Sequence, residues 1–281
     1  MADRKPYPTD LSAAQWLLIE GLIPLAKEGG APRTIDMREV VNTILYISRT
    51  GCQWRMIPHD LLPKSSVYDY FKAWKKDGTL QRIGDALRRR VRQQVGREED
   101  PSAAVIDTQT VKTHHQGAES DIDGGKNIKG RKRHIVVDTL GLLLAVTVTA
   151  GSLHDGRSAH RVLGKLSDRT TRRLEVIFAD SKYHTKPLED WLREHNQKYR
   201  IEVVKHQEPM HGFKVLRIRW VVERTYAWMG YNRRLSKDYE RTTSSSEAWA
   251  EISMIHLMLR RLSPGKKDPA FKYPKKLTKS A

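Results

Sequence analysis

The chain has 281 residues and a formal net charge of +18, because 51 lysines and arginines are set against 33 acidic residues. It contains no run of eighteen apolar residues and no apolar signal core at its N-terminus, so we expect neither a membrane span nor export. The single cysteine, Cys52, excludes an internal disulfide and a cysteine-rich zinc site, which favours a cytoplasmic location. The positive excess, interleaved with tryptophan and tyrosine, predicts a nucleic-acid partner. A basic proteome or a ribosome-like role would give the same charge.

Residues 9–95 are predicted to form a small all-helical domain. A long apolar face runs through LSAAQWLLIEGLIPLA, and in IDMREVVNTILYIS the apolar side chains recur at helical spacing. Gly51 stands where that second helix should stop, and Ser65 or Ser66 is placed to cap the next one. We therefore expect a group of short helices in this part of the chain.

The helices expected at about 65–76 and 79–95 are basic on one face. The first presents three lysines opposite its apolar stripe, Lys72, Lys75 and Lys76. A helix, a turn and a basic helix are compatible with a helix-turn-helix DNA-binding domain, so we expect helix 65–76 to lie in or near a DNA groove. Three packed helices with a basic face and no DNA role would produce the same pattern.

The pattern changes after the charged segment 96–102, which we interpret as a domain boundary. Two β-rich runs on either side of Leu140-Gly141 indicate a hairpin, and helices and short strands then alternate. This order predicts an α/β domain over 102–262 with a mixed sheet that has antiparallel edge strands. The lysine-rich remainder, 263–281, is expected to be a flexible tail.

Two aspartates follow apolar strand residues, Asp107 after AAVI and Asp180 after VIFA. Ligands of open α/β sheets collect beyond the carboxyl ends of the strands, so these carboxylates, with a third acid on a helix, would suit Mg²⁺. An aspartate at a strand end can also be a plain turn former or helix cap. Glu223 shares a helix face with Arg219, and on helix geometry alone an i, i+4 ion pair is the favoured explanation.

Several longer strings carry a family resemblance. VIDTQTVKT, KGRKRHIVVDTLGLLLAVTVTAGSLHDGRSA, VIFADSKYHT and RWVVERTYAWMGYNRRLSKDYE look like bacterial insertion-sequence transposases of the IS-five type, and GCQWRMIPHDLLPKSSVYDYFKAWKKDGT resembles their N-terminal domain. The resemblance covers residues 9–262 in matching order. It implies an RNase H-like DDE catalytic domain preceded by the helical DNA-binding domain. In that family the counterparts of Asp107, Asp180 and Glu223 are the catalytic acids, which hold two Mg²⁺ ions that Mn²⁺ can replace.

The same resemblance assigns DNA contacts. The arginine that precedes the family's glutamate by four residues corresponds to Arg219. The chain departs from the family's usual tyrosine and lysine with Leu216 and Gly230, so the phosphate contact of that lysine passes to one of Arg233, Arg234 and Lys237.

Three further groups of residues have the composition of a possible DNA-binding or metal site. The stretch 124–134 lacks a nucleotide-binding P-loop pattern, and we expect it to hold the DNA backbone unless it is a merely solvated hairpin; its cations are Lys126, Lys129, Arg131, Lys132 and Arg133. His154-Asp155 is interpreted as a helix cap rather than a metal site, and His114-His115 as a loop.

The expected function is therefore DNA transposition. The enzyme would bind the inverted-repeat ends of an insertion sequence, cleave a strand to free a 3′-OH, and transfer that end to target DNA. Its partners would be double-stranded transposon ends and target, and holding two ends implies a homodimer or higher assembly. The alternatives are a DNA-binding regulator or inactive transposase remnant, and an RNase H-like nuclease that only hydrolyses.

Overall fold

The computed structural model describes residues 4–26, 29, 33–114, 119–204 and 217–265. The N-terminal part holds short helices, and the two that begin at Ala13 and Met37 have side-chain N-caps, Ser12 and Asp36. Their bounds are α1 (Ala13–Leu17), η1 (Glu20–Leu22), α2 (Met37–Thr50), η2 (Trp54–Met56), α3 (Lys64–Lys76) and α4 (Thr79–Gln94). Within the ranges described, no helix combines the length and the hydropathy that a bilayer-spanning segment needs.

A mixed sheet follows these helices. Its strands are β1 (Ala103–Lys112), β2 (Asp121–Asp123), β3 (Ile128–Asp138), β4 (Leu143–Ala150), β5 (Val176–Ala179) and β6 (Arg200–Val203). The main order is β4-β3-β1-β5-β6, with β2 paired to the start of β3. β4, β3 and β1 are antiparallel neighbours, while β1, β5 and β6 run parallel. Three antiparallel strands continued by two parallel ones confirm the mixed α/β, RNase H-like class that the sequence predicts.

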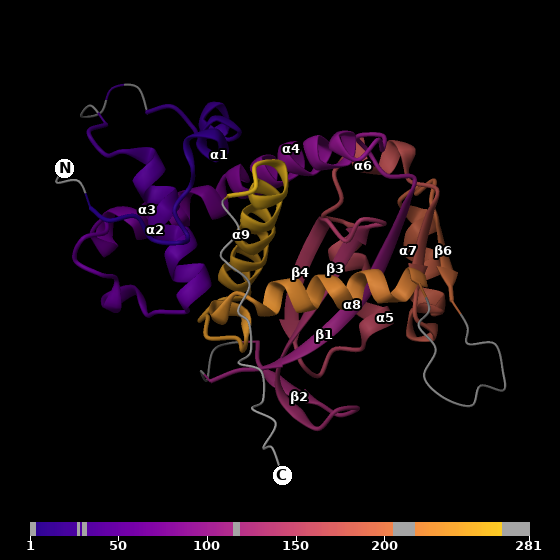
Figure 1. Ribbon diagram of the computed structural model, residues 1–281. Helices are drawn as coiled ribbons and strands as arrows, with labels where there is room; N and C mark the ends of the chain where they lie inside the picture. Colours follow the sequence, from indigo (N-terminus) through magenta and orange to yellow (C-terminus); the bar gives the residue numbers. More distant parts are fainter. Residues whose placement is uncertain (1–3, 27–28, 30–32, 115–118, 205–216, 266–281) are drawn as a thin grey trace, which may run out of the picture.

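Helices cover both faces of the sheet (Figure 1). One face packs against α8 (Arg217–Gly230) and α9 (Thr243–Leu262), and α9 also packs against α2, α3 and α4. The opposite face carries α5 (Asp155–Leu163) and α7 (Lys186–Glu194). Because side chains alternate along a strand, Val105 faces the core under α8 and its neighbours Ala104 and Ile106 face α5. The N-terminal helices thus share one hydrophobic core with α9 and the sheet.

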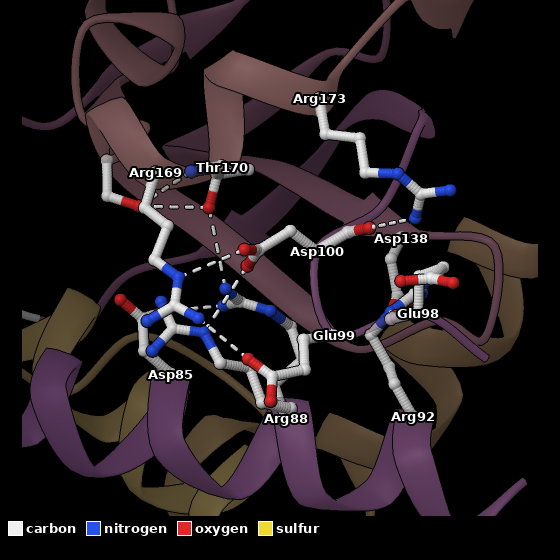
Figure 2. Close-up of polar contacts among 12 residues, drawn as sticks. Asp85, Arg88, Arg92, Glu98, Glu99, Asp100, Asp138, Arg169, Thr170 and Arg173 are labelled. Carbon is white, nitrogen blue, oxygen red and sulfur yellow. Dashed lines mark hydrogen bonds and ion pairs between the residues drawn. The ribbon is translucent and has the colours of Figure 1, made fainter. Parts of the chain in front are cut away.

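The remaining short elements are α6 (Asp168–Arg173), η3 (Ser181–Tyr183) and η4 (Arg233–Leu235). Figure 2 shows how α4 is tied to α6 and to the sheet through its arginines. Arg92 is 4% exposed, and its Nη1 donates to Asp138 Oδ2 over 2.6 Å. Arg88 is equally enclosed and bonds Asp85 and Thr170. These two arginines of a basic helix therefore hold the fold together.

The segment 96–102, interpreted from sequence as a boundary, is bound on both sides. The Arg92 Nε donates to the Glu98 carbonyl over 2.7 Å, and Arg169 of α6 pairs with Glu99 and Asp100 at 2.7 and 3.1 Å (Figure 2). The division into domains 9–95 and 102–262 stays a prediction, since the two parts share a core. Most of the tail, 266–281, lies outside the described residues.

Local signals in the sequence were mostly sound. Gly51 ends α2 with φ of 72°, in the left-handed region where glycine is favoured, and the hairpin of β3 and β4 forms as predicted. The predicted serine cap of α3 is wrong, because that helix begins at Lys64 behind Pro63 and has no side-chain cap. α5 ends at Leu163, and α6 begins at Asp168 behind its side-chain cap Ser167.

Candidate active site

Asp107 and Asp180 follow corresponding positions of the neighbouring parallel strands β1 and β5. β1 and β5 pair in parallel with Val105 in register with Phe178, and each aspartate comes two residues further along its chain. Two residues return the side chain to the same face of a strand, so both carboxylates belong to the face that α8 covers. Adjacent strands lie about 4.8 Å apart, which brings two acids from distant parts of the sequence together.

Asp180 is held by three donors. Its Oδ1 accepts from Ser181 Oγ at 2.8 Å and from the Lys182 amide at 3.3 Å, and its Oδ2 accepts from Arg219 Nη2 at 3.1 Å. Burial raises the pKa of this carboxyl, but the hydrogen bonds and the Arg219 charge outweigh burial, so the pKa lies below its ordinary value. Asp180 is therefore an anion whose charge Arg219 partly offsets.

In the Asp107 carboxyl, hydrogen bonds and positive charges offset the effect of burial on the pKa much less than in Asp180. The pKa of its carboxyl is raised to about 6, chiefly by burial and also by the charge of Asp180, against the lowering effects of the Thr108 amide, Arg219 and Lys126. A further positive charge near this carboxylate would lower that pKa and stabilise the ionised form. Carboxylate oxygens are the ligands that hard divalent cations prefer, so the two aspartates fit such an ion by donor type and by charge.

Glu223 lies on α8, four residues after Arg219, and is exposed. The next turn of that helix is anchored to β1, because the buried Tyr226 hydroxyl lies 3.0 Å from the Asp107 carbonyl and 2.8 Å from the Arg133 carbonyl. Among the residues described, no three His, Cys, Asp or Glu side chains gather closely enough to hold a metal ion. The convergence of Glu223 on the two aspartates stays a prediction.

α8 buries one side of its length against the core. Val222 and Met229 are each 1% exposed, whereas Ile218 near its start is 39% exposed. The side chain of Trp228 lies partly buried against the core and stacks with Arg224 and Arg261, at 4.6 and 4.3 Å from the guanidinium carbons to the ring. Val215 and Leu216 fall outside the described residues.

The candidate DNA-binding cations divide by exposure. Those that solvent reaches freely are Lys72, Lys76, Lys126, Lys129, Arg233 and Lys237. Two are half-buried with partners, since Lys75 donates to Ser244 and Ser245 of α9 and Arg219 binds Asp180. The exposed group is the one that a phosphate backbone can reach without unfolding the protein, although Lys72 within it pairs with Asp69 at 2.9 Å.

Four of the proposed cations are buried, and this corrects the sequence interpretation. Arg131, Lys132, Arg133 and Arg234 are between 1% and 8% exposed. Arg131 and Arg133 reach carbonyls of the segment after α8, at Glu240 and Leu235, each over 2.7 Å. The reason is that 128–138 is the central strand β3 rather than a loop, so its side chains enter the packed layers on both faces. These residues stabilise the fold and are shielded from DNA.

The histidine motifs have modest structural roles. His154 occupies the N-cap position of α5 without a side-chain capping bond, while Asp155 beside it pairs with Lys132 at 2.9 Å. His114 stacks on Tyr239 with 5.6 Å between ring centroids, and His115 lies outside the described residues. Sequence reasoning missed Tyr183 and Tyr226, whose hydroxyls approach β1; their only signal was position, three residues after Asp180 and Glu223.

Known proteins with similar sequences include a protein of Burkholderia cepacia named "Putative transposase for insertion sequence element IS402". It is 30% identical over 130 residues, or 44% of this chain, and the match spans 60% of that relative's length. "Uncharacterized protein y4sN" of Sinorhizobium fredii is 28% identical over 117 residues, covering 41% of this chain and 82% of its own. A solved structure, "Mos1 transposase paired-end complex with left transposon end", gives 12% identity and a TM-score of 0.22. That match covers 65% of this chain and 62% of that one, and the score is too low to carry an argument.

Two family models match the chain. The one described as "Putative transposase of IS4/5 family" covers residues 11–84, where the short N-terminal helices lie. The one described as "Transposase DDE domain" covers residues 98–258, more than half of the chain, and includes both aspartates and Glu223. The chain therefore belongs to the DDE-domain transposases of the IS4/5 type.

Proposed function

We propose that this protein is a metal-dependent DNA transposase that cleaves and joins strands at the ends of an insertion sequence. The observation that carries the proposal is the pair of carboxylates at corresponding positions after β1 and β5, on the sheet face that α8 covers. One of them, Asp107, has a pKa raised to about 6. A half-buried acid with a raised pKa beside a second acid would suit a divalent cation, whose charge would stabilise the ionised carboxylates. The family membership supplies the reaction class.

In this proposal Asp107, Asp180 and Glu223 hold two Mg²⁺ ions, and Mn²⁺ can replace them. The bound ions supply charge stabilisation for in-line attack on a phosphodiester. The chain's own residues set the geometry: the parallel pairing of β1 with β5 fixes the two aspartates, and Tyr226 fixes the helix that carries Glu223. Arg219 pairs with Asp180 at 3.1 Å and partly offsets its negative charge.

The proposed partner is double-stranded DNA. Lys126 and Lys129 lie on the turn before β3 and at its start, and the charge of Lys126 lowers the pKa of Asp107. Arg233 and Lys237 follow α8 and are exposed. Their positive charges favour contacts with DNA phosphates. A transposase must bring two ends together, so we also propose a homodimer or higher assembly on DNA.

The test is strand transfer by the full chain with Mg²⁺, a pre-cleaved end bearing a 3′-OH, and a supercoiled target. Asp107→Asn, Asp180→Asn and Glu223→Gln are each expected to abolish joining while retaining end binding. Asp190→Asn is the matched control, because this α7 aspartate pairs only with Arg193 on the surface among the described residues. Efficient nicking without joining would favour the hydrolytic nuclease, and unchanged joining in any acid variant would refute its assignment.

We also propose that the helical part recognises transposon ends, with α3 in or near a groove. Because α9 packs against α2, α3 and α4, removing the N-terminal part would uncover core residues, so point variants in the full chain make the cleaner test. Lys72→Ala and Lys76→Ala should weaken binding to inverted-repeat DNA, and the exposed Lys198→Ala should not. Equal affinity in all three variants would contradict the assignment of α3.

A further inference from the structure

A chain of hydrogen bonds crosses the sheet directly behind the two aspartates, on the face that α5 covers. Tyr183, the last residue of η3, is 2% exposed, and its hydroxyl lies 2.8 Å from Thr108 Oγ1. Thr108 Oγ1 lies 2.9 Å from His134 Nδ1, and His134 Nε2 lies 2.8 Å from Thr149 Oγ1. Thr149 Oγ1 in turn donates to the Ala150 carbonyl.

The protonation of His134 and the bond from Thr149 to a carbonyl indicate which atom donates in each hydrogen bond of this chain. Burial lowers the pKa of His134 to about 4, so the ring is neutral and has one N–H. Thr149 uses its proton on a carbonyl and must accept from His134 Nε2–H. His134 Nδ1 then accepts from Thr108, and Thr108 accepts from Tyr183. The Tyr183 phenol is thus the first donor, and burial keeps it protonated by raising its pKa well above the ordinary range.

The first bond of this chain joins the segments that carry the two aspartates. Thr108 is the residue after Asp107 on β1, and Tyr183 closes the short helix that Asp180 caps, with the Tyr183 amide donating to the Asp180 carbonyl over 3.0 Å. β5 itself ends at Ala179, and its pairing with β1 ends where Val105 faces Phe178. The Tyr183–Thr108 bond therefore continues the link between the strands past the end of their ladder.

The short helix η3 packs closely against α5. A Cβ added at Gly156 would lie 2.2 Å from the Lys182 carbonyl oxygen and 2.8 Å from Thr185 Cγ2, so only glycine allows this close approach. Asp155 adds a charge contact, with its carboxylate 3.8 Å from Lys182 Nζ. The His154-Asp155-Gly156 motif thus supports the segment that bears Asp180, which gives the motif a role outside the acids themselves.

We propose that Tyr183 is a positioning residue whose bond to Thr108 sets the spacing between the Asp107 and Asp180 carboxylates. This inference rests on the proposed function, because the spacing matters for a cation held by both acids. Outer partners of metal ligands typically change metal affinity 10- to 100-fold when they are removed. Loss of the Tyr183 hydroxyl should weaken cation binding while leaving DNA binding without metal unchanged.

The test is a titration of the full chain with Mn²⁺ in the absence of DNA, with binding monitored by electron paramagnetic resonance. Tyr183→Phe should raise the Mn²⁺ Kd by roughly tenfold. Tyr199→Phe is the matched control, since Tyr199 is 3% exposed in the same core and its hydroxyl has no hydrogen-bond partner among the residues that the structure describes. Thr108→Val removes the other end of the bond and should give the same shift. The double variant should lose no more than Thr108→Val alone, because both changes delete the same Tyr183–Thr108 bond; Thr108→Val also removes the bond to His134.

The results separate the positioning role of Tyr183 from the proposed metal site. A Kd within about twofold of wild type in folded Tyr183→Phe, or in Thr108→Val if the first variant does not fold, overturns the positioning role. Wild-type Mn²⁺ binding that survives Asp107→Asn overturns the proposed metal site and this inference with it. A long-range ¹H–¹⁵N spectrum should show His134 protonated at Nε2, and protonation at Nδ1 would contradict the direction of the chain.

Discussion

The buried ion pair between Arg92 and Asp138 offers a direct test of what the basic residues of α4 do. The Arg92 side chain is 4% exposed and that of Asp138 fully buried, with 2.6 Å between Nη1 and Oδ2. Asp138 also accepts the amides of Leu140 and Leu142 in the hairpin turn, at 2.9 and 2.8 Å. Replacing Arg92 by methionine would keep the apolar stem but leave this carboxylate buried without its counter-charge. Breaking a buried pair in this way costs about 3–5 kcal/mol.

That loss is a large part of the 5–15 kcal/mol that typically separates folded from unfolded protein. Urea unfolding of the full chain should therefore show a much lower midpoint for Arg92→Met than for wild type. Arg89→Met is the control, because Arg89 is 21% exposed and meets Asp100 at 3.3 Å, so its loss should cost less than about 1 kcal/mol. Affinity for DNA and its salt dependence should be the same for both variants under native conditions. Equal stability of the two variants, or a reduced salt dependence for Arg92→Met alone, would refute this assignment of Arg92 to the fold.

Three further changes test other parts of the structure. Burial raises the pKa of Glu251 from its ordinary 4.5 to about 7, so ionising it costs stability as pH rises through this window. Glu251→Gln should therefore raise the free energy of unfolding at pH 8, by at most about 3 kcal/mol, and leave it unchanged near pH 4, as urea titrations at both pH values would show. Gly51→Ala should destabilise by about 1–2 kcal/mol in thermal unfolding, because φ is 72° and the new Cβ would lie 3.0 Å from Arg233 Cβ; no loss would contradict this geometry. Lys129→Ala should lower the slope of log affinity against log salt by about one, measured by fluorescence anisotropy, and an unchanged slope would remove Lys129 from the DNA surface.

The sequence determined which segments form helices and strands wherever the signal is local. Helical spacing and Gly51 placed α2, and the two β-rich runs around Leu140-Gly141 placed the hairpin, because periodicity and turn chemistry act within a few residues. The same locality let the order of motifs indicate the family and make Asp107, Asp180 and Glu223 the candidates for its catalytic acids. Patterns of this kind carry no information on which side chains become enclosed.

Burial and pairing were decided only by the tertiary structure. Arg131 and Arg133 look like a DNA-binding run in the sequence, yet they point into packed layers because β3 lies in the middle of the sheet with strands on both sides. The level placement of Asp107 and Asp180 likewise depends on β1 pairing with β5 across about seventy residues of chain. Such long-range register is set by the competition of whole faces for the core, which no local pattern of residues encodes.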